Sequence, residues 1–242
     1  FHGFSDVMKE ITSIVLQFSP YGVFGLMASV VGSHGLNILL PFAKVIVALY
    51  LAAIVHILLV QSGIVVGLIG KRNPVRFLKD ISEAAVFMFA ACSSVATIPL
   101  TLKCTKKMGV SDKVANFVIP FGAVMNMDGT AIYEGIAAIF AAQIFGIDLS
   151  FNQQLLILLS ATLASIGTAG VPGSGLVMLT IVLATVGLPM ETIGLLAGID
   201  RILNMGRGVP NIVGDAACAV AIARTEGELM DNAISGGLQS NA

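Results

Sequence analysis

Long apolar stretches recur along this chain and limit its possible folds more than any other feature. They cover roughly residues 10–33, 37–69, 114–147, 153–187 and 190–223, with a shorter one near 84–100. A helix needs about 20 mainly apolar residues to cross a bilayer. Only 11% of the chain is charged, against about 25% in a soluble domain. The stretches lack the alternation of a barrel strand, and hydrocarbon does not tolerate unpaired backbone groups. We therefore expect an all-α multi-span membrane protein.

The composition divides the chain into three parts. We expect two scaffold-type transmembrane helices in residues 1–70, a core with broken helices in 71–225, and a polar tail in 226–242. Because the chain begins at Phe1 and shows no cleavable signal pattern, we interpret it as the C-terminal portion of a longer protein. Its three cysteines lack metal-ligand spacing, so we expect them to pack in the interior.

The basic residues indicate how the chain is oriented. Eight of the 13 Lys and Arg residues lie between Lys71 and Lys113, and the apolar stretch that follows has none. Cytoplasmic loops are enriched in Lys and Arg, so both ends of residues 81–102 should face the cytoplasm. A full crossing and a return would need about twice this length. We therefore predict a re-entrant hairpin, 74–108, that turns near Ser93–Pro99.

A glycine-rich tract interrupts a later apolar stretch. Four glycines and a proline fall within Ser165–Gly175, and such a segment does not form a regular helix. We interpret 152–187 as a second re-entrant hairpin, entered from the opposite face; the alternative is a small-residue motif for close helix packing. Each hairpin is followed by a span, 112–147 and 190–224. Inverted repeats of hairpins and broken helices are typical of secondary transporters, which bind solute where the repeats meet.

Polar residues repeat along the last predicted span with helical spacing. One face of a helix would carry all five of them, Asp200, Asn204, Arg207, Asn211 and Asp215. A charge at the bilayer centre costs about 2.5–3.5 kcal/mol even on the most lenient scale, so this face must contact protein or water. The planar guanidinium of Arg207 can hold a carboxylate through two hydrogen bonds. The alternative is that Arg207 pairs only structurally, with Asp200 or an asparagine.

Two further polar residues interrupt the span before the glycine-rich hairpin. Asn126 and Asp128 are two residues apart, which places them on different faces of a regular helix, so we expect local unwinding at Gly129. Unwinding frees backbone carbonyls, and hard cations such as Na⁺ bind carbonyl and carboxylate oxygens. Asp128 and Asp215, with Asn126 and Asn211, are therefore candidate cation ligands.

The two hairpin tips supply further hydrogen-bond donors. Ser93 and Ser94 lie at the first tip, and the glycine-rich tract offers backbone N–H groups at the second. Donors of both kinds near the N-termini of half-helices favour an anion. We expect the tips to hold a second carboxylate of the solute.

Four stretches of the chain carry a resemblance to the sodium:dicarboxylate symporter family, and the match covers essentially the whole chain. They are Ser93–Pro99, Asn126–Thr130, Ala164–Gly173 and Gly198–Asp215. The resemblance implies a homotrimer in the cell (plasma or inner) membrane whose core moves like an elevator. It implies inward symport of an acidic amino acid or a four-carbon dicarboxylate with Na⁺ and, as a further candidate, H⁺. No nucleic-acid partner is expected.

The resemblance also implies roles for single residues. The residues around the solute would be Ser93, Ser94, Thr130, Val171, Gly175, Asn204, Arg207 and Asn211. One Na⁺ would lie near Gly122, Asn126, Asn211 and Asp215. Another would lie near the carbonyls of Val124, Ser165, Ile166 and Thr168. A third would use residues of an earlier span outside this chain together with Asn126 and Asp128.

Two positions bear on the choice of solute and ion. Amino-acid carriers of the family usually have Asp where this chain has Asn204, and that Asp holds the substrate ammonium. Asn204 brings no counter-charge, which favours succinate, fumarate or malate. Glu134 matches the glutamate that resembles the proton carrier of the animal transporters, and a partly buried Glu can titrate near neutral pH. The alternative for Glu134 is a carboxylate hydrogen-bonded to a neighbouring span.

Other functions fit the residues less well. An intramembrane enzyme would need a nucleophile–base pair or a metal cluster, and the chain has no His-Glu-x-x-His motif, so we expect no enzyme activity. A passive ion channel, and a family member that carries neutral or other solutes, remain alternatives. His56 and Lys44 lie in the second apolar stretch, where we expect structural roles.

Overall fold

The computed structural model describes residues 17–18, 21–22, 24–25, 27–33 and 35–230. Most of these residues are helical and none of them belongs to a β-sheet, which confirms the expected all-α class. Much of the first predicted span, and residues 231–242 of the predicted tail, lie outside the described residues.

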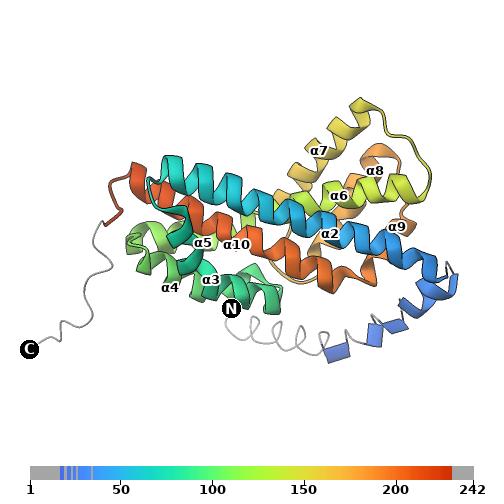
Figure 1. Cartoon of the computed structure of the whole chain (residues 1–242), viewed down its shortest axis with the longest axis horizontal. Helices are drawn as coiled ribbons and strands as arrows, with labels where there is room; N and C mark the ends of the chain where they lie inside the picture. The colour runs from blue at the N-terminus through green and yellow to red at the C-terminus, as the bar shows by residue number, and fades with distance from the viewer. Residues whose placement is uncertain (1–16, 19–20, 23, 26, 34, 231–242) are drawn as a thin grey trace, which may run out of the picture.

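From Leu36 onward, the described part of the chain folds into one 3-10 turn, nine α-helices and one π-helical segment (Figure 1). They are η1 (Leu36–Ile38), α2 (Leu39–Val55), the π-helical segment (His56–Ile69), α3 (Pro74–Ala91), α4 (Ser94–Lys107), α5 (Asp112–Met125), α6 (Asp128–Ile144), α7 (Phe151–Ile166), α8 (Ser174–Val186), α9 (Glu191–Ala197) and α10 (Asp200–Thr225). Among the described residues, one helical run, Leu36–Ile69, is long and apolar enough to cross a membrane, while α7 and α8 are apolar but shorter.

Helix α10 occupies the centre of the bundle. It packs against α2, the π-helical segment and α3–α6, and in Figure 1 it runs beside the long α2 helix. One apolar core joins α2 to α6–α9 through residues such as Leu49 and Leu183. A second core joins the π-helical segment to α3–α5 and α10 through residues such as Ile81 and Ile119. The helix that carries the predicted polar stripe is thus surrounded by the others.

Helices α3 and α4 pack against each other in the region of the first predicted hairpin, 74–108. The turn between them is shorter than expected, because Cys92 adopts a left-handed conformation (φ 55°) and Ser93 already caps α4. The Ser93 side chain accepts a hydrogen bond from the Ala96 N–H, which starts the helix there. Pro99 therefore lies inside α4, and the prediction that it belongs to the turn is wrong.

Helices α7 and α8 pack against each other in the region of the second predicted hairpin, 152–187. A capping box of Ser150 and Gln153 starts α7. The loop after α7 runs to Gly173, whose φ of 83° is a conformation that glycine adopts without strain. The glycine-rich tract thus interrupts the helix, as the sequence predicts.

Both spans that follow the hairpins are divided in two. The first consists of α5 and α6, and its break lies at Asn126–Met127, so the prediction of unwinding at Gly129 is wrong. Gly129 instead lies in the first turn of α6, where a Cβ atom would collide with the carbonyl oxygen of Arg207 in α10. Gly129 therefore permits a close contact between α6 and α10. The second span consists of α9 and α10, with a break at Gly198–Ile199.

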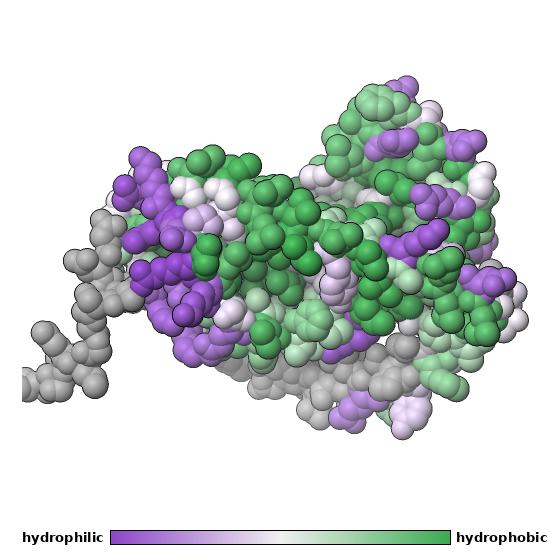
Figure 2. Space-filling model, viewed as in Figure 1, coloured by the Kyte–Doolittle hydropathy of each residue, from purple (hydrophilic) through white to green (hydrophobic). Residues whose placement is uncertain are grey.

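Large apolar side chains cover much of the outer surface. On the π-helical segment and α7, Leu59, Leu68, Leu158 and Leu163 are each more than 60% exposed. Figure 2 shows an apolar band along α2, with hydrophilic side chains gathered at the left-hand end of the view. Extended apolar surfaces of this kind mark contact with lipid or with other protein segments. The distribution fits a bundle that lies in a bilayer.

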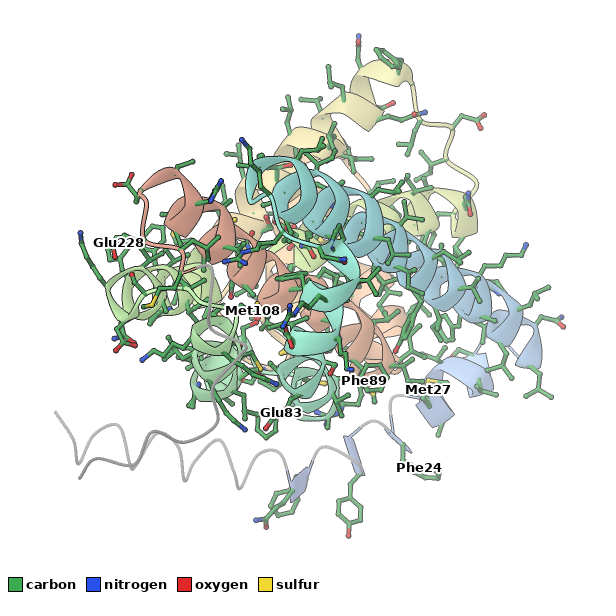
Figure 3. The ribbon with its side chains drawn as sticks, turned by 60° about the vertical axis from the view of Figure 1, so that its left-hand side comes forward. Phe24, Met27, Glu83, Phe89, Met108 and Glu228 are labelled. Atoms are coloured by element: carbon green, nitrogen blue, oxygen red, sulfur yellow. The ribbon has the colours of Figure 1, made fainter. Side chains whose placement is uncertain are left out.

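The segment after α10 folds back onto the loop between α4 and α5. The Ser111 N–H donates to the Glu228 carbonyl oxygen (3.1 Å), and the Met230 N–H donates to the Gly109 carbonyl oxygen (2.9 Å). Figure 3 labels Glu228 at the left of the view and Met108 nearer its centre. The start of the predicted tail is thus tied to the end that carries the basic loops.

Candidate functional site

The polar face of α10 points into the protein. Asn204, Arg207, Asn211 and Asp215 are 6%, 2%, 4% and 1% exposed, and the Asp200 side chain is mostly buried. The prediction that this stripe faces away from lipid is confirmed. Because buried polar groups need partners, the neighbours of each side chain show what the stripe can bind.

Arg207 is enclosed by groups from three helices. Its Nη1 lies 3.3 Å from Asp200 Oδ1, and its Nε donates to Asn204 Oδ1 at 3.3 Å. The guanidinium carbon lies 4.3 Å from the centre of the Tyr133 ring, and a Cβ atom at Gly175 would lie 2.8 Å from Nη1. Arg207 therefore makes both pairings that a purely structural arginine would make, one with Asp200 and one with Asn204. Nη1 nevertheless makes no well-oriented hydrogen bond to a described residue, so part of the binding capacity of the fork is unused.

The tips of the two helix pairs meet each other. Ser93 Oγ donates to the Gly170 carbonyl oxygen (3.0 Å), and the Val95 N–H reaches the same oxygen (3.4 Å). Gly170 has no room for a side chain, since a Cβ atom would lie 2.7 Å from the Ala123 carbonyl oxygen. The first tip, the second tip and the end of α5 are thus in direct contact.

A small cavity lies between these tips and α10. Its volume is about 10 Å³, close to the roughly 10–15 Å³ that a cavity needs to hold one water molecule. Its lining includes six of the eight predicted solute residues, namely Ser94, Thr130, Val171, Asn204, Arg207 and Asn211. The other two lie next to it, because Ser93 bonds to Gly170 in the lining and Gly175 contacts Arg207. Arg207 is the one charged residue among the described residues of the lining.

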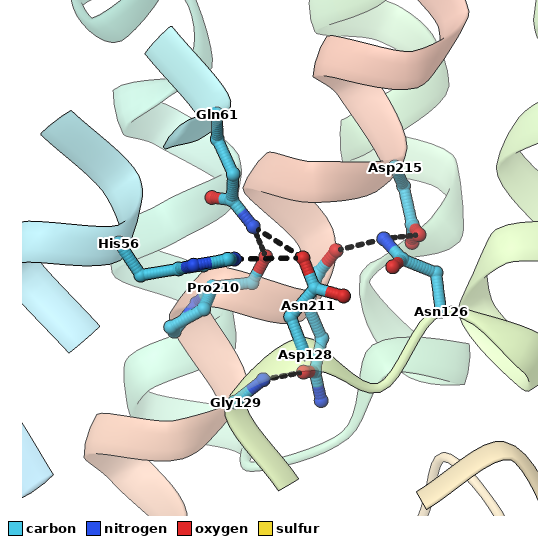
Figure 4. A network of polar contacts seen from close by, with 8 residues as sticks. All are labelled: His56, Gln61, Asn126, Asp128, Gly129, Pro210, Asn211 and Asp215. Atoms are coloured by element: carbon cyan, nitrogen blue, oxygen red, sulfur yellow. Dashed lines mark hydrogen bonds and ion pairs between the residues drawn. The ribbon is translucent and has the colours of Figure 1, made fainter. Parts of the chain in front are cut away.

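The break between α5 and α6 meets the second half of α10 (Figure 4). Asn126 Nδ2 donates to Asp215 Oδ1 (2.9 Å) and to the Asn211 carbonyl oxygen (3.3 Å). A Cβ atom at Gly122 would collide with the Asp215 carboxylate, so the structure brings the first predicted Na⁺ set together. Asp215 Oδ2 is buried and has no hydrogen-bond partner in the described part of the chain. An unpaired buried carboxylate oxygen is costly, and a cation beside it would supply the missing partner.

Asp128 takes different partners from Asn126. His56 Nε2 lies 3.0 Å from Asp128 Oδ2, and Gln61 Nε2 donates to the same oxygen at 2.9 Å. Both partners come from the π-helical segment, and sequence analysis missed them as site residues. The available signal was a histidine and a glutamine inside an otherwise apolar stretch. The Gly129 N–H, next in the chain, donates to Asn211 Oδ1 at 2.8 Å.

The second predicted Na⁺ set lies on two neighbouring helix ends. Ser165 and Ile166 end α7 and Thr168 follows them, whereas Val124 lies at the end of α5. The two helices pack against each other, and the Thr168 N–H donates to the Ser165 carbonyl oxygen (3.0 Å). No hydrogen bond between described residues joins Val124 to the other three. The structure thus brings these residues near one another without assembling a closed set.

Glu134 is fully buried in α6. Neither of its carboxylate oxygens has a hydrogen-bond partner among the residues that the structure describes. The alternative role of Glu134 requires a hydrogen bond to a neighbouring span, and the described part of the chain contains no such bond. Glu134 follows Tyr133, whose ring contacts Arg207. Glu134 is therefore next in the chain to a residue that touches the candidate solute site.

The chain is similar over most of its length to glutamate symporters from bacteria and to an excitatory amino acid transporter from an animal. The chain is 36% identical over 228 residues to the proton/sodium-glutamate symport protein of Bacillus caldotenax. The aligned region covers 94% of this chain and 54% of that protein. The chain is 37% identical over 228 residues to the proton/glutamate-aspartate symporter of Escherichia coli (strain K12), with 93% and 51% covered. It is 39% identical over 222 residues to excitatory amino acid transporter 3 of Mus musculus, with 89% and 42% covered. The chain thus spans about half the length of these curated relatives.

A family profile covers nearly all of the chain. Residues 1–225 match the sodium:dicarboxylate symporter family. The four stretches that carry the resemblance lie inside this match, and each contributes residues to the lining of the small cavity. The chain belongs to the sodium:dicarboxylate symporter family.

Proposed function

We propose that the full-length protein is a secondary active symporter that carries a small carboxylate-bearing solute together with Na⁺. The solute would be an acidic amino acid or a four-carbon dicarboxylate, moved inward across the cell membrane. The family supports this proposal, as do relatives that are described as glutamate or glutamate–aspartate symporters.

The position of Arg207 carries the proposal. It is a buried guanidinium, the one charge among the described residues of a cavity that is lined by the two hairpin tips, α3, α6 and α10. Its contact with Asp200 is an ion pair without a well-oriented hydrogen bond. A buried pair of this kind adds little to stability by itself. A solute carboxylate could accept two hydrogen bonds from the planar fork.

Movement of a hairpin tip would admit the solute, because the cavity of about 10 Å³ has room for about one water molecule. Two hydrogen bonds to the Gly170 carbonyl oxygen join the tips, and they would have to break. We infer that α3–α4 and α7–α8 are re-entrant hairpins from opposite faces, that each forms a repeat with the broken span after it, and that α7–α8 is the outer gate. The core would move as an elevator within a homotrimer.

The co-transported Na⁺ would bind at the breaks of the helices. Asp215 Oδ2 is buried without a partner among the described residues, and Asn126 and Asn211 lie beside the carboxylate. Val124, Ser165, Ile166 and Thr168 would supply a second set of oxygens, and Asp128 a third with Asn126. These oxygen-rich positions suit a hard cation.

Proton co-transport would involve Glu134. Its carboxyl group is fully buried and unpaired within the described part of the chain, and an isolated charge there would be costly. A proton that enters with the solute and leaves on the other side would fit this position. Several relatives are described as proton/sodium-glutamate symporters.

The charge of the cavity bears on the choice of solute. Asp200 is not part of the lining and pairs with Arg207, and Asn204 Oδ1 already accepts from Arg207 Nε. The ammonium of an amino acid would therefore meet only neutral acceptors, whereas a dicarboxylate has no ammonium to satisfy. We propose a four-carbon dicarboxylate as the preferred solute.

The test is a thermal-shift screen of the full-length protein in detergent. Dicarboxylates and acidic amino acids are added with Na⁺ or with choline in its place. We expect a dicarboxylate to raise the melting temperature only when Na⁺ is present, because the solute and the cations occupy one connected network. Equal shifts in Na⁺ and choline, or no shift with any acidic solute, would count against the proposal.

Substitution of Asn204 tests the choice of solute. We expect Asn204→Asp to raise the affinity for L-aspartate relative to succinate by about tenfold or more, because an ion-paired hydrogen bond to the ammonium is worth about 1.5–3 kcal/mol. Competition against a labelled solute measures the ratio. The matched control is Asn152→Asp on the exposed face of α7, which should leave the ratio unchanged. A parent protein that already binds L-aspartate much more tightly than succinate would contradict the proposed solute.

A further inference from the structure

The π-helical segment brings two polar side chains onto one carboxylate oxygen. His56 and Gln61 are five residues apart and lie in the first turns of this segment. In an α-helix, residues five apart are about 140° apart around the axis. The i→i+5 hydrogen bonds of a π-helix instead bring such residues close to the same side, and π-helical turns are rare and concentrated at functional sites. The unusual helix geometry thus explains why both side chains reach Asp128.

The contacts form a clamp on Asp128, which we define as His56 and Gln61. Both Nε2 atoms meet Asp128 Oδ2, at 3.0 and 2.9 Å. Because a carboxylate oxygen only accepts hydrogen bonds, the donors are the imidazole N–H and the amide N–H. Gln61 Nε2 also donates to the Pro210 carbonyl oxygen at 2.8 Å. The clamp therefore ties the start of α6 to the middle of α10 (Figure 4).

The clamp lies beside the first predicted cation set. A Cβ atom at Gly214 would lie 2.6 Å from Asn126 Nδ2, 2.8 Å from Gln61 Nε2 and 3.1 Å from Asp128 Oδ2. Three polar groups from three elements thus converge over the α-carbon of one glycine. Asn126 in turn donates to Asp215 Oδ1, so the position of Asp128 is linked to that of the second carboxylate.

Asp128 depends on the clamp for its orientation. Its side chain is 33% exposed, and no hydrogen bond between described residues reaches its other oxygen, Oδ1. Two donors on Oδ2 fix the carboxylate and leave Oδ1 available to a ligand. A free carboxylate at this exposure would rotate among its rotamers and lose ligand-binding geometry.

We propose that His56 and Gln61 are positioning residues that set Asp128 for binding of a co-transported Na⁺. The inference rests on the proposed function, since it assigns these two residues to its ion coupling. They act through Asp128 and touch neither the solute cavity nor Arg207, because neither residue lines that cavity. Loss of the clamp therefore weakens Na⁺ binding while the solute site itself stays intact.

The experiment measures Na⁺ dependence and solute affinity separately in the full-length protein. We expect Gln61→Leu to raise the Na⁺ concentration for half-maximal solute binding by about tenfold, with solute affinity at saturating Na⁺ within about twofold of the parent. His56→Gln, which keeps an N–H donor, should shift Na⁺ dependence less than His56→Leu. The matched control is Ser62→Ala, because Ser62 is buried beside Gln61 and its hydroxyl has no described hydrogen-bond partner; it should behave like the parent.

A double-mutant comparison keeps the inference falsifiable if one variant folds poorly. In an Asp128→Asn background, Gln61→Leu should add little to the change in Na⁺ dependence, because both substitutions remove the same function. An unchanged Na⁺ dependence in Gln61→Leu, an equal shift in Ser62→Ala, or additive effects in the double mutant would overturn the clamp. A parent protein that binds solute without Na⁺ would instead overturn the proposed function.

Discussion

We expect Arg207→Cys to abolish the binding of acidic solutes while the protein still folds and inserts. Arg207 is the one charged residue among the described residues of the cavity lining, so its loss leaves a solute carboxylate without a counter-charge. Removing one partner of a buried, hydrogen-bonded charge pair costs about 2–5 kcal/mol, which corresponds to a loss of affinity of about thirtyfold or more. Arg207→Lys keeps the charge but not the planar fork, so its affinity should fall between those of the parent and Arg207→Cys.

The measurement is equilibrium binding of labelled solute to full-length protein at saturating Na⁺. The matched control is Arg224→Ala, an exposed arginine near the end of the same helix, which should retain parental affinity. An Arg207→Cys protein that binds the solute as tightly as the parent would show that Arg207 only pairs with Asp200 and Asn204. The pairings seen in the structure would then be its whole role.

The second large effect is expected at Gly129. A Cβ atom there would collide with the carbonyl oxygen of Arg207, and the main chain of a packed helix cannot move aside as a flexible side chain can. Overpacking of this kind costs about 1–3 kcal/mol of unfolding free energy. The shift of α6 away from α10 would also break the hydrogen bond from the Gly129 N–H to Asn211 Oδ1 (2.8 Å). We therefore expect Gly129→Ala to lower the melting temperature by several degrees and to impair binding of both solute and Na⁺.

Gly135→Ala is the matched control for this substitution. Gly135 lies in the same helix, and a Cβ atom there would meet nothing within 4 Å. Alanine is favoured over glycine in a helix by about 1 kcal/mol, so this variant should be as stable as the parent or slightly more so. Equal melting temperatures for Gly129→Ala and Gly135→Ala would contradict the close contact between α6 and α10.

Sequence periodicity was sufficient to predict the polar face of α10. Five polar residues at helical spacing in an apolar segment can only be accommodated if they face inward, and four of them are almost fully buried. The two interrupted helix pairs were predictable for a similar reason. A tract with four glycines and a proline cannot continue a helix. The stretch between the two basic loops is too short for a full crossing of the bilayer and a return.

The exact helix breaks could not be predicted, because tertiary contacts decide them. Gly129 reads as a helix breaker, yet its role is to let α6 approach the backbone of α10. Pro99 reads as a turn residue, yet the Ser93 cap starts α4 before it. The clamp of His56 and Gln61 was also beyond reach, since a spacing of five residues brings two side chains together only in a π-helix.

Coupled transport is the central claim, and uptake into proteoliposomes tests it most directly. Full-length protein is reconstituted, and ²²Na⁺ uptake is measured with and without a four-carbon dicarboxylate, alongside labelled dicarboxylate uptake with and without a Na⁺ gradient. We expect each flux to require the other substrate, and both to disappear in Arg207→Cys. Na⁺ flux that persists at the same rate without the dicarboxylate, or dicarboxylate uptake that ignores Na⁺, would contradict a symporter built around this site.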